Sequence, residues 1–255
     1  MTGFPDDVRS WDSLAESFAK THSTLALCFP GYSTEQPVTI PRWGFAFDEV
    51  VAMLRATIVA HFGERKIVLV GHDWGSYVCF LYVNRYRDSI DKFVTLDVGL
   101  YAPKDMTLAS NLLDVGYKGT LALAFVFRAI GVPVLGILAV ALYPWKFLGP
   151  CPYETKVPPR VKDWFKKPDL GLCYPYFNLF AGVFTNTFPV PKLSNVPTLF
   201  LYGKNKRIMF HSSAFLMALD KADNSKHIAY DCGHFMQSQV PGPVADAVAD
   251  FIKPS

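Results

Sequence analysis

The chain has 255 residues, of which 51% are hydrophobic and 18% are charged. This composition is too apolar for a disordered chain, and the length excludes a disulfide-stapled miniprotein. It fits one large domain, or a domain that carries an insertion. The net charge is only +3 and no basic run stands out, so a nucleic-acid partner is not expected.

The five cysteines are scattered along the chain and form no CxxC pair. Neither a metal site nor a disulfide framework is therefore expected, and we predict reduced thiols, a cytoplasmic location and no cofactor. Residues 1–11 carry no secretory hydrophobic stretch. The sequence does not predict an oligomeric state.

Strand-like apolar runs alternate with helical patterns, which is typical of a mostly parallel α/β sheet. The predicted strands are residues 24–29, 66–70, 93–96, 197–202 and 226–230. The predicted helices are residues 45–62, 75–86 and 244–252. From Tyr101 to Val196 the alternation stops and the chain is rich in aromatic residues and proline. We therefore expect a core of residues 1–100 and 197–255, with residues 101–196 as a helical lid over one end of the sheet.

One stretch, Thr120 to Leu142, contains a single charged residue, Arg128. Its length is borderline for a membrane-spanning helix, which needs about 20 apolar residues. Arg128 and Pro133 both weaken that interpretation. A buried or substrate-lining helical hairpin is favoured, and association with a membrane surface stays open as the alternative.

The most informative segment is 70–76, which reads VGHDWGS where a predicted buried strand meets a predicted helix. Gly71 and Gly75 flank Asp73 at two positions on either side, which is the pattern of a nucleophile elbow. Glycine suits these positions because strand and helix backbones approach each other closely there. The turn would lift the Asp73 side chain off the carboxyl edge of the sheet and aim the Trp74 N–H at the same space. The alternative is that Asp73 only caps the helix.

No G-x-S-x-G string occurs, so the central residue of the elbow is a carboxylate rather than a serine. A carboxylate suits attack at saturated carbon and forms an ester that water must later cleave. Such a nucleophile needs a general base and an acid that orients the base. We predict His234, after the last strand, as the base and Asp97, at the end of strand 93–96, as the acid. Asp231 is the second candidate for the acid.

Three strings then resemble known motifs of the epoxide hydrolase branch of the α/β-hydrolase superfamily, to which haloalkane dehalogenases are close relatives. Residues 71–75 (GHDWG) resemble the elbow, residues 3–6 (GFPD) the oxyanion loop and residues 233–235 (GHF) the histidine loop. The resemblance implies an α/β-hydrolase fold with a helical lid, Asp73 as nucleophile and His234 as base.

The resemblance also implies two hydrogen-bonding sites. The backbone N–H groups of Phe4 and Trp74 would form an oxyanion hole. In this family two lid tyrosines donate to the epoxide oxygen, where negative charge develops as the ring opens. Tyr176, in the string YFN, resembles the second of them, and Tyr117 the first, although Lys118 follows it where glutamine is usual.

The chain also departs from the family pattern. The family has three strands before the oxyanion loop, whereas this chain starts at Met1 directly on that loop, with Thr2 where histidine is usual. We therefore expect the sheet to lack its first strands and the activity to be impaired. An acid at Asp97 resembles many dehalogenases more than typical epoxide hydrolases.

Together these features predict a hydrolase that opens a small lipophilic epoxide to a vicinal diol through an ester on Asp73. One alternative is a haloalkane dehalogenase, in which the Trp74 indole binds halide with Trp145 or Trp164 as the second donor. The other is a truncated, non-catalytic hydrolase-like protein. An apolar lid indicates a lipophilic ligand, because pockets for such ligands are lined mostly by hydrophobic side chains.

Overall fold

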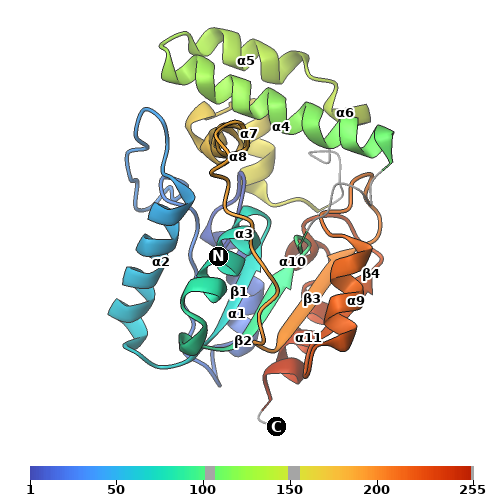
Figure 1. Ribbon diagram of the computed structural model, residues 1–255. Helices are drawn as coiled ribbons and strands as arrows, with labels where there is room; N and C mark the ends of the chain where they lie inside the picture. The colour runs from blue at the N-terminus through green and yellow to red at the C-terminus, as the bar shows by residue number, and fades with distance from the viewer. Residues whose placement is uncertain (101–106, 149–155, 254–255) are drawn as a thin grey trace.

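A parallel sheet forms the centre of the molecule, as the sequence predicts. The computed structural model describes residues 1–100, 107–148 and 156–253. Its strands follow the order β1 (Ile67–His72), β2 (Ile90–Leu96), β3 (Thr198–Gly203) and β4 (Lys226–Tyr230). His72 pairs with Leu96, and Leu96 with Leu201. The carboxyl ends of these strands therefore lie level at one edge of the sheet (Figure 1).

Helices cover both faces of the sheet (Figure 1). One face carries α2 (Phe47–Phe62), α3 (Trp74–Arg85) and α9 (Ser213–Lys221), and the other carries α1 (Asp12–Phe18) and α11 (Pro241–Ile252). Successive residues of a strand point to opposite faces. Phe93 therefore joins the cluster with α3, whereas Val94 joins the cluster with α11. Burial on both faces explains why these strands are continuous apolar runs in the sequence.

A layer of helices lies over the carboxyl edge of the sheet (Figure 1). This helical layer consists of α4 (Leu108–Ala129), α5 (Pro133–Leu142), α6 (Trp145–Leu148), α7 (Pro159–Lys166) and α8 (Tyr174–Phe184). Residues 120–142 form a hairpin of two helices that turns at Gly131, where φ is 86°. Within the described residues, none of the helices has the length and apolar character needed to cross a bilayer. That the layer acts as a lid domain, and that the sheet lacks its first strands, both stay predictions.

The other predicted elements are confirmed with small shifts at their ends, but the predicted strand at residues 24–29 is wrong. A strand needs a ladder of backbone hydrogen bonds to a neighbour. Among the described residues, this segment has one such bond to an adjacent segment, from the Thr2 N–H to the Leu27 carbonyl (2.9 Å). Met1 occupies the adjacent edge of β1, where its amino group donates to the Val70 carbonyl (2.6 Å) and its carbonyl accepts from the His72 N–H (3.0 Å).

Asp6 is a buried carboxyl group in the loop before α1. Burial raises its pKa to about 7, although the Asp7 N–H donates to it over 2.9 Å. Between the pKa of the unfolded chain, near 3.8, and this value, the folded state holds a proton that the unfolded chain has released. The free energy of unfolding therefore falls as the pH rises through that window.

We predict that Asp6→Asn removes this pH dependence. The variant should match the wild type at about pH 4 and exceed it at about pH 8, by on the order of 2–4 kcal/mol. Urea unfolding followed by circular dichroism across this pH range measures the difference. A stability difference that is the same at every pH would contradict the assignment.

Candidate active site

Asp73 stands at a tight turn between β1 and α3. Its backbone has φ 56° and ψ −130°, a conformation that costs energy for a residue other than glycine and is found most often at functional sites. The flanking positions have no room for a side chain, so glycine is required at both. A Cβ on Gly71 would lie 2.7 Å from the Ser76 Cα, and one on Gly75 would lie 2.2 Å from the Met1 carbonyl oxygen. The structure therefore has the elbow geometry that the GHDWG string predicts.

Backbone N–H groups bind the Asp73 carboxylate. The Phe4 N–H donates to Oδ1 over 2.7 Å, and the Trp74 N–H also hydrogen-bonds to the carboxylate. Gly3 lets the loop come this close, since a Cβ there would lie 2.2 Å from the same oxygen. The two N–H groups predicted to form an oxyanion hole thus both bind the Asp73 carboxylate. Met1 holds this loop in place through its backbone bonds to β1.

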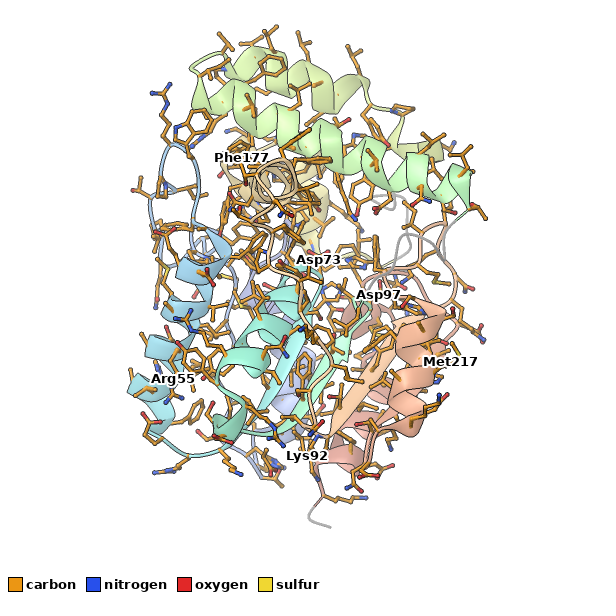
Figure 2. The ribbon with its side chains drawn as sticks, viewed as in Figure 1. Arg55, Asp73, Lys92, Asp97, Phe177 and Met217 are labelled. Atoms are coloured by element: carbon orange, nitrogen blue, oxygen red, sulfur yellow. The ribbon has the colours of Figure 1, made fainter. Side chains whose placement is uncertain are left out.

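His234 lies between two carboxylates. Its Nε2 is 3.3 Å from Asp73 Oδ2, and its Nδ1 is 2.5 Å from Asp97 Oδ2. Figure 2 shows Asp73 and Asp97 beneath the helical layer. Asp231, the other candidate acid, is exposed and pairs with Lys204 at 3.0 Å. The structure thus brings Asp73, His234 and Asp97 together and leaves Asp231 outside the site.

The buried charges of the site stabilise one another. Burial alone would lower the pKa of His234, but the hydrogen bonds and charges of Asp73 and Asp97 outweigh it and raise this pKa to about 10. Burial would raise the pKa of Asp73, yet His234 holds it below its ordinary value. The pKa of Asp97 is also lowered, because Lys206 and His234 overcome the effect of burial. The directions of these shifts favour an imidazolium between two carboxylates in the resting site.

Lys206 is a member of this site that the sequence analysis missed. Its Nζ pairs with Asp97 Oδ1, which also accepts from the Gly203 N–H (3.0 Å), and its side chain is only 1% exposed. It belongs to the loop after β3, residues 203–207 (GKNKR), where no carboxylate occurs. A lysine at the carboxyl end of a strand that neighbours Asp97 was the available signal, but lysines in polar loops are usually solvated.

His72 supports the histidine loop from behind. Its Nε2 donates to the His234 carbonyl (3.0 Å), and its Nδ1 accepts from the Gln237 amide (3.2 Å). Burial lowers the pKa of His72 to about 4, so its ring is neutral near pH 7. This pattern of bonds fixes the position of the His234 backbone without placing His72 in the cavity.

A small cavity of about 30 Å³ lies over Asp73 and His234. Tyr117 from α4 and Tyr176 from α8 both line it, with their ring centroids 6.1 Å apart. Tyr176 also packs edge-on against Phe4, at 5.1 Å between centroids. A cavity of this size has room for at least one ordered water molecule beside the two catalytic candidates.

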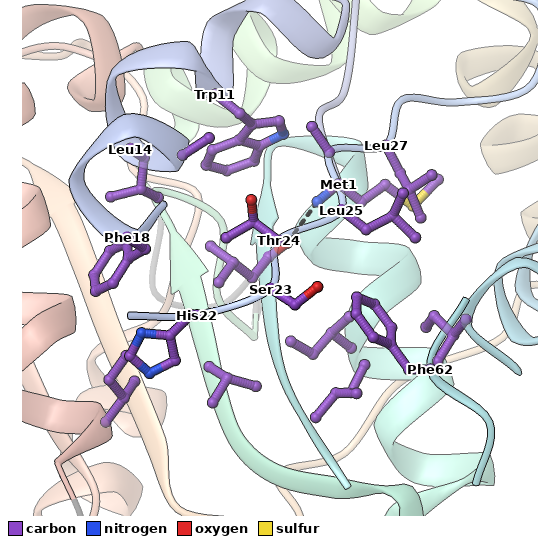
Figure 3. Close-up of a pocket in the computed structure, with 18 of the residues that line it drawn as sticks. Met1, Trp11, Leu14, Phe18, His22, Ser23, Thr24, Leu25, Leu27 and Phe62 are labelled. Carbon is purple, nitrogen blue, oxygen red and sulfur yellow. Dashed lines mark hydrogen bonds between the residues drawn. The ribbon is translucent and has the colours of Figure 1, made fainter. Parts of the chain in front are cut away.

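A larger cavity of about 360 Å³ lies elsewhere, beside β1 (Figure 3). Its walls are mostly apolar and include Trp11, Phe18 and Phe62. None of the residues that line it is a candidate catalytic residue. Chemistry requires titratable groups within reach of a bound molecule, so we place the candidate site at the smaller cavity.

Free cysteines and metal ligands give no further site. Four cysteines are free thiols, and Cys151 lies outside the described residues. Across residues 1–100, 107–148 and 156–253, no group of three or more histidine, cysteine or acidic side chains could hold a metal ion. A cytoplasmic location stays a prediction.

Comparisons with known proteins agree with this geometry. The family profile described as alpha/beta hydrolase fold matches residues 1–126. Epoxide hydrolase 3 of Xenopus tropicalis is 22% identical over 272 residues, which cover 99% of this chain and 70% of that protein. Among solved structures, the Bacillus megaterium epoxide hydrolase in complex with an inhibitor superposes with a TM-score of 0.69 at 19% identity, covering 98% of this chain and 91% of that one.

Potato (Solanum tuberosum) epoxide hydrolase I gives a TM-score of 0.68 at 18% identity, covering 99% of this chain and 91% of that one. At these identities the structural likeness shows the fold. Sequence, fold and comparisons converge on one conclusion: the chain has the α/β-hydrolase fold, and it is similar to epoxide hydrolases in sequence and in structure.

Proposed function

We propose that the chain opens lipophilic epoxides to vicinal diols through a covalent ester on Asp73. The observation that carries this proposal is that the two oxygens of the Asp73 carboxylate have different partners. Its Oδ1 accepts from the Phe4 N–H and its Oδ2 faces His234, at a cavity that Tyr117 and Tyr176 also line. The similar proteins named as epoxide hydrolases support the same chemistry.

The first step is displacement at carbon. Oδ2 of Asp73 attacks one carbon of the epoxide ring, and the bond from that carbon to the ring oxygen breaks. The electron pair moves to the oxygen, which stays bonded to the neighbouring ring carbon and takes a proton from one tyrosine hydroxyl group; the phenolate left behind is reprotonated through water in the cavity. The hydroxyl groups of Tyr117 and Tyr176 donate to this oxygen while its charge develops.

The second step is hydrolysis of the ester. Neutral His234 accepts a proton from water at Nε2 while the water oxygen adds to Cγ of Asp73. Negative charge develops on Oδ1, where the N–H groups of Phe4 and Trp74 stabilise it. The bond from Cγ to Oδ2 then breaks, and Oδ2 takes the proton back from His234 and leaves as a hydroxyl group of the diol, while the water oxygen stays on Asp73.

A haloalkane dehalogenase is the weaker alternative, because both tryptophans predicted as its second halide donor are bound elsewhere. The indole N–H of Trp145 donates to the Val140 carbonyl (2.8 Å), and that of Trp164 donates to the Asp169 carbonyl (2.9 Å). Both candidate donors are therefore engaged within the protein. The non-catalytic alternative does not account for a carboxylate that faces both a histidine and a cavity.

We predict that His234→Gln stops the reaction at the ester. With styrene oxide, the variant should gain the mass of one epoxide on the peptide that contains Asp73, while diol turnover falls by on the order of 10³-fold or more. Intact-protein and peptide mass spectrometry measure the adduct. Asp73→Asn is the control and should gain no mass. An adduct on another residue, or none in His234→Gln, would sink the proposal.

We also predict that Tyr117→Phe and Tyr176→Phe each slow ester formation by about 10²-fold, because each removes one donor from the developing alkoxide. Tyr230→Phe is the matched control, since its hydroxyl donates to the Pro243 carbonyl (3.0 Å) away from the cavity. Stopped-flow or rapid-quench kinetics give the rate. Equal rates in all three variants would remove the tyrosines from the mechanism.

Contact with a membrane surface is a further part of the proposal, because apolar side chains of the α4–α5 hairpin are exposed. They include Leu108, Leu112, Val134, Leu138 and Leu142. The cavity itself is lined by phenylalanines and Trp145, which suits a lipophilic substrate. A hairpin that touches the bilayer would place the cavity close to dissolved substrate.

Sedimentation with phosphatidylcholine vesicles tests this contact. The wild type should sediment with the vesicles, and the double variant Leu138→Glu, Leu142→Glu should lose most of that binding, since charged groups are costly to bury in lipid. Met217→Glu is the control, because Met217 is equally apolar and exposed but lies on α9 (Figure 2). A wild type that stays in the supernatant would contradict the contact.

A further inference from the structure

The carboxylate of Asp97 has a buried cation on one side and the candidate base on the other. Oδ1 accepts from Lys206 Nζ and from the Gly203 N–H (3.0 Å), whereas Oδ2 faces His234 Nδ1 at 2.5 Å. The Lys206 side chain is 1% exposed and that of Asp97 is fully buried. Water screens such a pair only weakly, so the charge of Lys206 acts on the whole His234–Asp97 pair.

The balance of charge changes during the proposed reaction. In the resting site two carboxylates, Asp73 and Asp97, oppose two cations, His234 and Lys206, so the formal charges cancel. When Asp73 becomes an ester it loses its charge, and the three remaining groups carry one net positive charge. Release of the His234 proton then restores neutrality. Without Lys206 the same release would leave the Asp97 carboxylate buried and uncompensated, which is unfavourable.

We propose that Lys206 is a positioning residue for the hydrolytic step: its ammonium group balances Asp97, so that His234 releases its proton and becomes a base once Asp73 is an ester. The inference rests on the proposed function. In this event only the N–H bond at His234 Nε2 breaks, and the proton passes through water in the cavity to the tyrosine phenolate left by the first step. Lys206 also occupies Asp97 Oδ1, which leaves Oδ2 for His234.

Several other ionisable groups surround His234, and none supplies the same charge. His72 lies behind it, with 4.6 Å between ring centroids, and is neutral because burial lowers its pKa to about 4. From the helical layer, Tyr117 and Tyr176 line the same cavity. These three side chains carry no positive charge near pH 7.

Two further groups lie near the ring of Phe210, which packs against His234 at 5.4 Å. Lys118 lies 5.9 Å from this ring, but its ammonium group pairs with Asp114 at 2.6 Å. His211 has its pKa lowered to about 4 by burial and by the charge of Lys206. Among the described residues, Lys206 is therefore the cation, besides His234 itself, that acts directly on Asp97.

A titration of His234 tests the electrostatic part without any turnover. Asp73→Asn places a neutral side chain where the ester would stand, and NMR of the imidazole then gives the His234 pKa. Adding Lys206→Met should raise that pKa by about one unit or more, since an adjacent charge shifts a pKa by roughly 1–3 units. An unchanged or lowered pKa overturns the proposal.

Lys204→Met is the matched control for this titration. Lys204 lies on the same loop, is 49% exposed and pairs with Asp231 rather than Asp97. Its removal changes the net charge by the same amount but should leave the His234 pKa unchanged. If Lys206→Met does not fold, as judged by circular dichroism, Lys206→Gln keeps a donor for Asp97 without the charge and is titrated in its place.

Rapid-quench kinetics with styrene oxide test the chemical part. Lys206→Met should slow hydrolysis of the ester about tenfold at pH 7 and shift the pH–rate profile of this step to higher pH. The rate of ester formation should stay within about threefold of the wild-type rate. Lys206→Arg should return the profile toward that of the wild type. A rate lowered by the same factor at every pH would indicate a structural role and overturn the proposal. Absence of any ester in His234→Gln would instead contradict the proposed function, and the titration would still report on Lys206.

Discussion

A buried carboxylate that has to stay charged is the constraint on which the site depends. Asp73 is held in a tight turn, in a cavity of about 30 Å³, where burial favours its neutral form. The structure offsets this by hydrogen bonds from the Phe4 and Trp74 N–H groups and by His234, which faces Oδ2. These partners favour the anion, which is the state that a nucleophile requires.

The same arrangement holds a proton on His234, so a second requirement is that His234 releases this proton before it can act as a base. Two anions raise the pKa of this histidine, and a protonated imidazole cannot take a proton from water. The loss of charge at Asp73 and the presence of Lys206 at Asp97 both act in the direction of releasing that proton. The resting site therefore suits displacement, and the ester would suit hydrolysis.

Local sequence patterns predicted most helices and strands of the fold. Buried parallel strands appear as continuous apolar runs, and the tight turn at Asp73 appears as a pair of glycines. The GHDWG string and the apolar strands gave the elbow and the sheet, and the ends of strands placed Asp97 and His234 on one edge. Residues 24–29 were misread because an apolar run does not reveal whether a partner strand offers hydrogen bonds. Lys206 was missed because its burial arises from packing between distant loops.

A single turnover in H₂¹⁸O tests the central claim most directly. If Asp73 forms an ester and water attacks its Cγ, the new oxygen should appear in the Asp73 carboxylate, and the diol from that first turnover should carry none. Peptide mass spectrometry and analysis of the diol measure both. Heavy oxygen in the first diol, with an unlabelled Asp73, would mean that water attacks the epoxide itself and would contradict the account.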